Sequence, residues 1–404
     1  MPSLVTIDLS EDKEKQMFKI LTYNNISRAG LDRLPDERYD VTAQVDNPDA
    51  ILLRSFNLHG QPIHESLKAV GRAGAGVNNI PVAEYTKRGI PVFNAPGANS
   101  NAVAELAIAG MLLAARNIVP ALNFVHGLEG DEDSLNEQIE KNKKHFAGFE
   151  LSGKTLGVLG LGAIGVKVAN SAAALGLNII GFDPFMSLEN AWKLTSSAEP
   201  ASSIDDLVSR SDLISLHIPL NDKTRNLFSE EHISRIKKGA ILLNFSRAGV
   251  VDEAAVLAAL DSGALHAYVC DFPTPALINH PRAITLPHLG ASTEEAEDNC
   301  AAMVADQLRE FLEHGTIRNS VNFPEVVVTP SGESVRLCIA NQNKPGVVGH
   351  ISTVLGEAGL NILDLLNKSR GDYAYTLVDI EANAPAEILE RIRAIDGVLS
   401  VRVI

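Results

Sequence analysis

The 404-residue sequence is poor in cysteine, in aromatic residues and in positive charge. Phe, Trp and Tyr together make up 5% of it. The cysteines, Cys270, Cys300 and Cys338, are odd in number and far apart, which argues against a disulfide framework or a thiolate zinc site and predicts a cytoplasmic setting. Lys and Arg number 35 against 50 Asp and Glu, which gives a formal net charge of −15. Such a surface repels nucleic acid and anionic lipid, so we expect neither as a partner.

Long apolar runs and metal-ligand spacings are also missing. No stretch of about 18 apolar residues occurs, so the sequence predicts no membrane span. Residues 1–19 are mixed and acidic, without the apolar centre of a signal peptide. The 11 histidines form neither H-x-x-x-H nor H-E-x-x-H, so we expect no metal site.

The remaining composition is that of an ordinary globular protein. Hydrophobic residues make up 45% of the chain, and there are 30 Gly and 19 Pro. A length of 404 residues suggests about three domains. Trp192 and the phenylalanines show no repeated spacing, and we expect them in the core.

Apolar runs alternate with helical patterns over most of the sequence. The runs at 51–53, 69–70 and 90–93 indicate buried parallel strands, and an apolar helix is expected over 100–117. Strands and helices then alternate from 155 to 286 before a long helix over 293–314, which is typical of a doubly wound parallel sheet. The highly charged stretch 129–144 indicates a solvated helix or loop.

The C-terminal part has a different order of elements. From 335 to 404 the pattern is strand, helix, strand, strand, helix and strand, which indicates a ferredoxin-like βαββαβ unit. The stretch 322–332 is the expected linker to it.

A glycine-rich turn in the middle of the chain points to a dinucleotide. Gly160-Leu161-Gly162-Ala163-Ile164-Gly165 fits G-x-G-x-x-G between a strand and a helix. The helix that opens there offers free N–H groups and a positive dipole end to a pyrophosphate. Asp183 closes the next strand, where a carboxylate accepts hydrogen bonds from ribose hydroxyls and repels a 2′-phosphate. The cofactor we predict is therefore NAD.

Three further motifs carry a family resemblance. They are His217-Ile218-Pro219 with Thr224, Asn244-Phe245-Ser246-Arg247, and Pro287-His288-Leu289-Gly290-Ala291-Ser292. Together they resemble the D-isomer-specific 2-hydroxyacid dehydrogenase family over residues 50–320, and the C-terminal unit resembles the ACT domain of some members. The resemblance implies an α/β fold with a Rossmann-like NAD-binding domain (99–289) inserted in a flavodoxin-like substrate-binding domain (1–98 and 290–325). A ferredoxin-like ACT regulatory domain (332–404) follows.

Three residues suit the chemistry of oxidising a 2-hydroxy acid. Loss of hydride from C2 requires a base for the hydroxyl proton, and His288 can serve. Arg247 can hold the carboxylate with two parallel hydrogen bonds. Relatives add a Glu that holds the imidazole, but the segment 268–275 lacks it. Asp271 is the remaining candidate, either as a cofactor contact or as the partner of His288.

The resemblance also implies the binding residues. Those for the cofactor are Gly160, Gly162, Ala163, Ile164, Gly165, Asp183, His217, Pro219, Thr224, Phe245, Ser246, Arg247, Asp271, His288, Gly290 and Ala291. Those for the substrate are Arg54, Ser55, Gly74, Ala75, Gly76, Asn99 and Arg247. In the ACT-like unit, Asn343 and Asn361 match positions that bind an amino-acid effector, and the alternative is a unit that only dimerises.

The expected activity is that of an oxidoreductase. The resemblance implies NAD-dependent oxidation of D-3-phosphoglycerate to 3-phosphohydroxypyruvate, the first step of L-serine biosynthesis. One alternative is another D-2-hydroxyacid dehydrogenase, such as a hydroxypyruvate or glyoxylate reductase. A second, of a different class, is an NAD(H)-sensing binding protein. A homodimer or homotetramer is expected.

Overall fold

A computed structural model describes residues 17–329 and 334–404. The chain forms two compact units, one up to Ala98 and again from Glu297 to the C-terminus, the other Asn99–Ala296. The second unit therefore extends to 296, whereas we expected the nucleotide-binding domain to end at 289. The first 16 residues of the expected substrate-binding domain, and residues 332–333 of the expected ACT domain, lie outside the described residues.

The first unit begins with a five-stranded parallel sheet in the order β2-β1-β3-β4-β5. Its strands are β1 (Phe18–Tyr23), β2 (Tyr39–Thr42), β3 (Ala50–Leu53), β4 (Ala69–Arg72) and β5 (Val92–Phe93), with α1 (Arg28–Leu31) and α2 (Val82–Lys87) between them. The order is flavodoxin-like. The central strand β3 is buried along its whole length, as expected for a parallel strand covered on both faces.

The long helix α12 (Glu294–His314) packs against this sheet. Gly71 in β4 lets it approach, because a Cβ there would lie 2.5 Å from a methyl of Val304. Val304, Leu308 and Phe311 from one side of α12 are buried in the same cluster as β1 and β3. The helix thus supplies much of the core of this unit.

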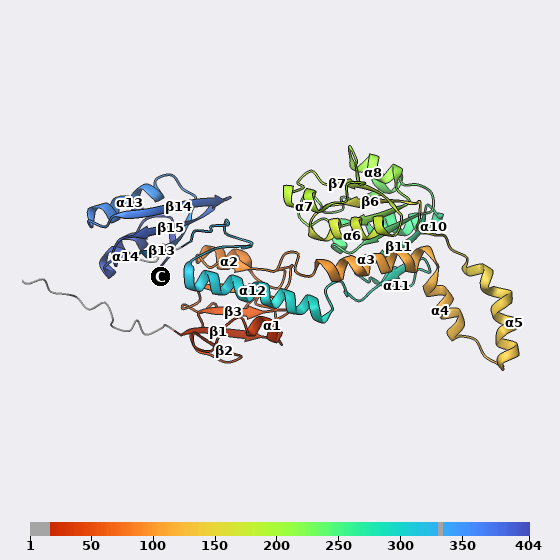
Figure 1. Ribbon diagram of the computed structural model, residues 1–404, viewed down its shortest axis with the longest axis horizontal. Coiled ribbons are helices and arrows are strands. Elements are labelled where there is room, and N and C mark those ends of the chain that lie inside the picture. The colour runs from red at the N-terminus through yellow and green to blue at the C-terminus, as the bar shows by residue number, and fades with distance from the viewer. Residues whose placement is uncertain (1–16, 330–333) are drawn as a thin grey trace, which may run out of the picture. The chain divides into compact units, whose positions relative to one another are not determined.

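The C-terminal domain is a βαββαβ fold, drawn in blue in Figure 1. Its elements are β13 (Val335–Gln342), α13 (Val347–Glu357), β14 (Ile362–Arg370), β15 (Tyr373–Ile380), α14 (Ala386–Arg393) and β16 (Val398–Val403), and the sheet order is β14-β15-β13-β16. The pairs β14–β15, β15–β13 and β13–β16 are antiparallel. Leu337 and Ile339 of β13 pack with the two helices. The alternate residues Cys338 and Ala340 pack in the cluster that contains Phe311 of α12, so both faces of the sheet are covered.

The second unit contains a seven-stranded sheet in the order β12-β11-β10-β9-β6-β7-β8, in which each strand runs parallel to its neighbours. Its strands are β6 (Thr155–Leu159), β7 (Asn178–Phe182), β8 (Glu199–Pro200), β9 (Leu213–Leu216), β10 (Ala240–Asn244), β11 (Leu265–Cys270) and β12 (Ala283–Thr285). The α-helices on or between them are α3 (Ser100–Ala115), α6 (Ala163–Ala174), α7 (Leu188–Lys193), α8 (Ile204–Arg210), α9 (Glu230–Ile233), α10 (Glu253–Ser262) and α11 (Pro275–Ile278), and the short 3₁₀ turn 248–250 precedes α10.

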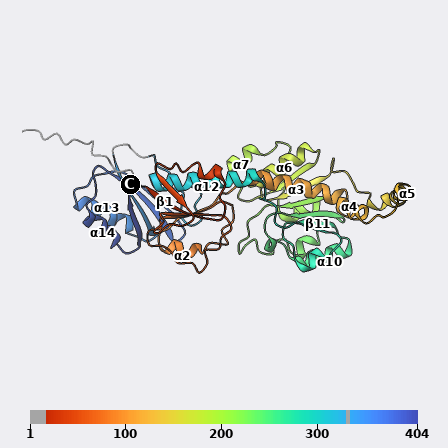
Figure 2. The ribbon, with the colours of Figure 1, turned by 90° about the horizontal axis from the view of Figure 1, so that it is seen from below.

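Helices cover both faces of this sheet, with α3 and α6 on one side and α10 on the other (Figure 2). The helix expected over 100–117 ends at Ala115, and Asn117 adopts a left-handed backbone with φ 49° before α4 (Ile118–His126). Most of the apolar surface of α3 is used within the chain, against α6 and the sheet.

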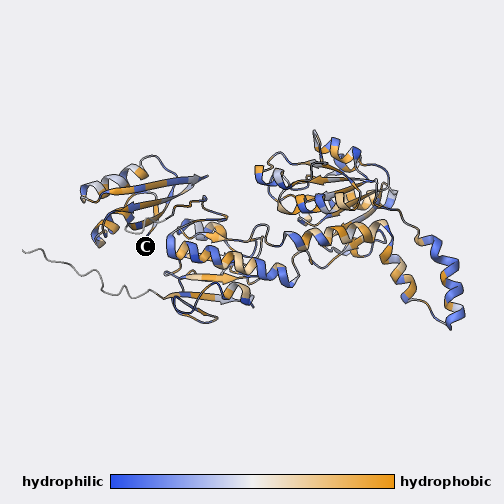
Figure 3. Ribbon diagram, viewed as in Figure 1, coloured by the Kyte–Doolittle hydropathy of each residue, from blue (hydrophilic) through white to orange (hydrophobic). Residues whose placement is uncertain are grey.

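The segment after α3 is much less buried. Neither α4 nor α5 (Glu132–Asn142) contains a buried residue, and α5 is mostly polar (Figure 3), so the charged stretch forms a solvated helix followed by a 3₁₀ turn at 143–146. The expectation that Trp192 belongs to the core is wrong: it is 88% exposed on α7. Of the described helices, none alone is long and apolar enough to cross a membrane; only α3 and α4 taken together, bent by 68°, meet that test.

The fold class expected from the sequence is confirmed. Two parallel sheets, the first flavodoxin-like in order and the second doubly wound, are followed by a ferredoxin-like domain. The functional names of the domains remain predictions.

Candidate active site

The glycine-rich turn lies between β6 and α6, and two of its glycines are required by the chain itself. Gly160 has φ 92°, a left-handed conformation that favours glycine. A Cβ on Gly165 would lie 1.9 Å from the carbonyl oxygen of Gly160, so only a glycine lets the helix begin this close to the strand. These two residues fix the shape of the turn.

Gly162 has a different environment, and it bears on whether a dinucleotide fits. A Cβ there would meet no protein atom within 4 Å. The residue is the N-cap of α6, and the helix begins at Ala163 and Ile164, whose N–H groups belong to the unpaired first turn. Open space beside unpaired N–H groups at the N-terminus of a 12-residue helix suits a pyrophosphate.

Asp183 lies directly after β7 and is joined to the turn. Its Oδ2 accepts a hydrogen bond from the Leu161 N–H at 2.8 Å, and its Oδ1 accepts one from the Phe185 N–H at 2.8 Å. The carboxylate is therefore held beside the glycine-rich turn, in the place expected for recognition of the adenosine ribose.

We expect Asp183→Ser to raise the KM for NAD by about 10- to 100-fold, because a hydrogen bond to a charged group contributes about 1.5–3 kcal/mol. The same variant should use NADP better, since the repulsion of the 2′-phosphate is lost. Steady-state kcat/KM with both cofactors measures the change. Asp205→Ser, at a half-buried carboxylate of α8 that pairs with Arg235, is the control. An unaltered preference for NAD would contradict the assignment.

The segment that contains His217, Pro219 and Thr224 follows β9. His217 Nε2 lies 2.8 Å from Ser215 Oγ, and its Nδ1 is buried without a hydrogen-bond partner among the described residues. Burial lowers the pKa of His217 to about 4, so the ring is neutral near pH 7. Thr224 Oγ1 donates to the Pro219 carbonyl at 2.5 Å and accepts from the Asn221 N–H at 2.8 Å, so it shapes this loop from within.

Acid should destabilise the protein partly through His217. The unfolded residue has a pKa of about 6.5 and the folded one of about 4, so the unfolded chain binds more protons between these values. Stability is therefore lost as the pH falls from 6.5 towards 4. We expect His217→Gln to reduce the drop in unfolding free energy between pH 7 and pH 5 by about 1–2 kcal/mol. Urea unfolding at both pH values measures it, and His126→Gln, exposed on α4, should leave the drop unchanged.

The Arg247 loop follows β10 and is organised by a buried amide. Asn244 Oδ1 accepts from the N–H and hydroxyl of Ser246, at 3.1 and 2.8 Å, and its Nδ2 donates to the Arg247 carbonyl at 3.0 Å. Phe245 and Ser246 are buried. Arg247 is exposed, and its guanidinium donates to the Ser246 carbonyl at 2.6 Å. Among the described residues it pairs with no carboxylate, so its charge is open to a ligand.

Asp271 follows β11 and is 2% exposed. Its Oδ1 accepts from the Leu289 N–H and its Oδ2 from the Gly290 N–H, each at 2.7 Å. Both oxygens are thus bonded to the backbone just after His288 and not to its imidazole. A Cβ on Gly290 would lie 3.1 Å from Oδ2, so the glycine leaves room for this arrangement.

His288 itself follows β12 and is exposed. Its backbone is left-handed, with φ 57°, which is uncommon for residues other than glycine. The ring meets Phe272 edge-on at 5.4 Å between centroids and has no hydrogen-bond partner among the described residues. Ala291, two residues on from Leu289, is half-buried.

The expected substrate residues in the first unit lie around the ends of β3 and β4. Arg54 pairs with Glu297 at 2.7 Å, a partner that sequence reasoning missed. The Ser55 N–H donates to Asn24 Oδ1 at 3.0 Å. In the loop 74–76, the Ala75 carbonyl accepts from Asn94 Nδ2 at 2.5 Å.

A second cation, Arg72, lies against the same loop and was also missed. Its Nη1 would lie 2.4 Å from a Cβ on Gly74, and its Nε donates to the Arg54 carbonyl and to Asn79 Oδ1, each at 3.1 Å. The signal was present in the sequence, because Arg72 ends the run 69–70 much as Arg54 ends 51–53. Asn99 belongs to the second unit, where its Oδ1 is buried without a hydrogen-bond partner among the described residues.

The two expected effector residues are far apart within one chain. Asn343 Nδ2 donates to the Gly371 carbonyl at the β14–β15 turn, at 3.0 Å. The Asn361 carbonyl accepts from the Glu381 N–H, which follows the other end of β15. An eight-residue strand separates these ends by roughly 25 Å, so one small ligand cannot touch both in a single chain. Over the described ranges, no group of three His, Cys, Asp or Glu is placed to hold a metal.

Comparisons with known proteins agree on one family. The model of the D-isomer specific 2-hydroxyacid dehydrogenase NAD-binding domain matches residues 108–290. The D-3-phosphoglycerate dehydrogenase of Haemophilus influenzae is 32% identical, over 99% of this chain and 100% of that one. That of Methanocaldococcus jannaschii is 42% identical over 71% of this chain, which spans 54% of its length.

A solved structure shows the same likeness. The NAD⁺-bound 3-phosphoglycerate dehydrogenase of Entamoeba histolytica aligns with a TM-score of 0.60 at 26% identity, over 76% of this chain and 99% of that one. The family's NAD-binding domain covers the glycine-rich turn, Asp183, Arg247 and His288. The chain therefore belongs to the D-isomer-specific 2-hydroxyacid dehydrogenase family, on the branch of the D-3-phosphoglycerate dehydrogenases, with a C-terminal domain of the ACT fold.

Proposed function

We propose that the chain oxidises D-3-phosphoglycerate to 3-phosphohydroxypyruvate with NAD, the first step of L-serine biosynthesis. The observation that carries the proposal is the place of three side chains. Arg247, Asp271 and His288 follow β10, β11 and β12, which are neighbours in the parallel sheet. Their carboxyl ends meet at one edge of the sheet, where open α/β sheets bind ligands.

Each of these residues has its own role in the proposed reaction. The glycine-rich turn and Asp183 would hold NAD⁺, which would supply the acceptor for the hydride of C2. His288 takes the proton of the C2 hydroxyl and returns it in the reverse direction. Arg247 holds the carboxylate through two parallel hydrogen bonds and polarises the carbonyl that forms. Asp271 holds the backbone after His288 and so sets the position of the imidazole.

The phosphate is the feature that separates this substrate from other 2-hydroxy acids. We assign it to Arg54, Arg72, Ser55 and the N–H groups of the loop 74–76. One observation favours the alternative, a reductase of unphosphorylated hydroxypyruvate or glyoxylate: Glu297 already neutralises Arg54 at 2.7 Å. For the phosphate to bind, Arg54 must exchange this exposed carboxylate for the ligand, at little cost because exposed pairs contribute at most about 1 kcal/mol.

Kinetics with matched substrates test the assignment. We expect the kcat/KM for 3-phosphoglycerate to exceed that for unphosphorylated D-glycerate by at least about 100-fold, since two charge-assisted hydrogen bonds are lost. Arg54→Gln should lower that ratio about tenfold or more by raising the KM for 3-phosphoglycerate alone. Arg318→Gln, an exposed ion-paired arginine of the same unit, is the control.

The outcomes distinguish the alternatives. Equal rates with hydroxypyruvate and phosphohydroxypyruvate as NADH oxidants would favour the unphosphorylated substrate. NAD(H) binding without turnover of any 2-hydroxy acid would favour the sensing protein instead.

We also propose that the protein assembles as a homodimer or homotetramer in the cytoplasm. Leu112 at the end of α3 and Leu122 and Val125 on α4 are 39%, 50% and 51% exposed, which leaves an apolar surface for a second copy. The separation of Asn343 and Asn361 means that an effector touching both would need two ACT domains. Addition of serine to the kinetic assay tests for such an effector.

A further inference from the structure

The sheet of the C-terminal domain caps the end of α12. The guanidinium of Arg402 donates to the carbonyls of Phe311 and Leu312. Arg336 donates to the His314 carbonyl at 3.0 Å, and the Tyr375 hydroxyl donates to the Gly315 carbonyl at 3.0 Å. Leu312 and His314 carry carbonyls of the kind that a helix C-terminus leaves without internal partners, whereas the Phe311 carbonyl also accepts from the Gly315 N–H at 2.9 Å. Three strands of the C-terminal domain, β13, β15 and β16, therefore supply hydrogen-bond donors to the C-terminal end of α12.

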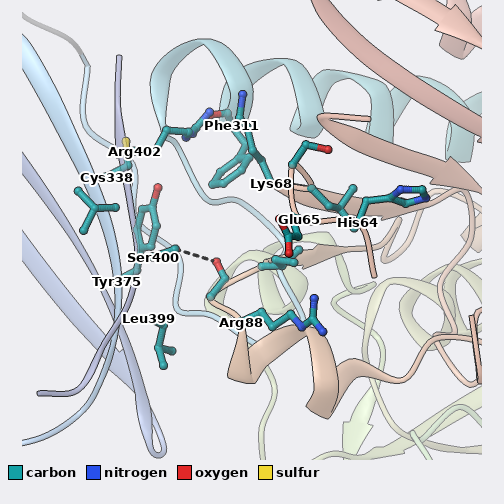
Figure 4. A pocket seen from close by; sticks show the side chains of 15 residues that line it. His64, Glu65, Lys68, Arg88, Phe311, Cys338, Tyr375, Leu399, Ser400 and Arg402 are labelled. Atoms are coloured by element: carbon teal, nitrogen blue, oxygen red, sulfur yellow. Dashed lines mark hydrogen bonds between the residues drawn. The ribbon is translucent and has the colours of Figure 1, made fainter. Parts of the chain in front are cut away.

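A cavity of about 420 Å³ lies beside this junction (Figure 4). One side is formed by Tyr375, Ser400 and Arg402 of the C-terminal domain. The other is formed by residues 64–68 and 88–90 of the first domain, which is the part of the first unit that contains β1 to β5 and α12. A volume in this range suits a small metabolite. The Ser400 hydroxyl donates to the Gly89 carbonyl at 3.3 Å across the junction, so the two sides are already in contact at one point.

The charge of the cavity contrasts with that of the whole chain. Lys68, Arg88 and Arg402 line it, against the single carboxylate of Glu65. Lys68 is paired with Asp49 at 2.6 Å. Over residues 17–329 and 334–404, neither Arg88 nor Arg402 pairs with a carboxylate; Arg88 donates to the Ile63 carbonyl at 3.2 Å and Arg402 to the end of α12. Two arginines from two domains thus line one cavity in a protein of net charge −15.

We propose that this cavity binds a small organic dianion, through Arg88 from the first domain and Arg402 from the C-terminal domain. The shared chemistry of the ligand is two anionic groups, carboxylate or phosphate, because guanidinium groups match both. The Tyr375 and Ser400 hydroxyls already donate to the Gly315 and Gly89 carbonyls, so the two guanidinium groups are the donors to the ligand. A ligand held by both domains stabilises their junction, since it binds the docked form and not the separated one.

The test uses the full chain with Arg54→Gln, which weakens the proposed substrate site. Inorganic phosphate and succinate are titrated separately by calorimetry, so that one arm reports phosphate and the other carboxylate recognition. We expect at least one of them to bind with a dissociation constant in the millimolar range or below and to raise the melting temperature. Addition of Arg88→Gln should weaken that binding by about tenfold or more, the loss expected for one charge-assisted hydrogen bond.

Arg391→Gln is the matched control, because Arg391 is an exposed arginine of the C-terminal domain that pairs with Glu357 outside the cavity. It should change the affinity less than twofold. Arg402→Gln should also weaken binding, but it removes the cap of α12, so Arg88→Gln decides. The proposal is overturned if neither anion binds, if Arg88→Gln leaves the affinity unchanged, or if Arg391→Gln reduces it equally. None of these measurements requires turnover, so their outcome is independent of the proposed reaction.

Discussion

Arg247→Ala should lower kcat/KM for 3-phosphoglycerate by about 10³-fold, or about 4 kcal/mol of transition-state stabilisation. The reason is the loss of two hydrogen bonds between a guanidinium and a carboxylate, each of which contributes about 1.5–3 kcal/mol. The residue is exposed, and among the described residues its side chain donates only to the carbonyl of the preceding residue, so the free energy of unfolding should not change. Steady-state kinetics and a thermal melt measure the two effects separately.

Two controls sharpen this experiment. Arg247→Lys keeps the charge but loses the planar fork, so we expect an intermediate loss of about 10- to 100-fold. Arg235→Ala removes an exposed arginine of the same unit that is paired with Asp205, and it should leave kcat/KM unchanged. A near-normal kcat/KM for Arg247→Ala would show that another group holds the carboxylate.

The parts of the site that follow from local spacing were predictable from the sequence. The glycine-rich turn is one example, because Gly160 has φ 92° and a Cβ on Gly165 would meet the Gly160 carbonyl only five residues away; the close approach of His217 to Gly160 comes from a distant segment. The place of Arg247 after β10 and of His288 after β12 is another, since the alternation of strands and helices already indicated a parallel sheet. The βαββαβ order of the C-terminal domain was predictable as well, because its strand and helix patterns follow one another along the sequence.

Contacts between distant segments were not predictable from spacing. Glu297 meets Arg54 only because α12 packs beside the end of β3, and nothing near either residue signals it. The hydrogen bonds of Asp271 to Leu289 and Gly290 depend on the pairing of β11 with β12. Trp192 was expected in the core and is exposed, because the size of a side chain does not determine which face of a short helix it occupies.

His288→Gln should lower kcat by about 10²- to 10⁴-fold, the usual contribution of a general acid or base, and leave stability unchanged. Glutamine keeps a polar group of similar length but cannot take the hydroxyl proton. The imidazole is exposed and meets Phe272 edge-on, so little packing is lost. Single-turnover rates of NADH formation and a urea melt measure the two effects.

Asp271→Asn then separates positioning from proton chemistry. An Asn can accept from one of the Leu289 and Gly290 N–H groups, but its amide N–H₂ must face the other, so a buried donor loses its partner at a cost of about 1–3 kcal/mol. If Asp271 positions the loop after His288, the variant should lose stability by that amount together with about 10- to 100-fold in kcat. If Asp271 is instead the acid partner of the imidazole, kcat should fall without loss of stability. The bonds of both carboxylate oxygens to the backbone favour the first result, in which the missing family Glu is not replaced and His288 works without a carboxylate bonded to its ring.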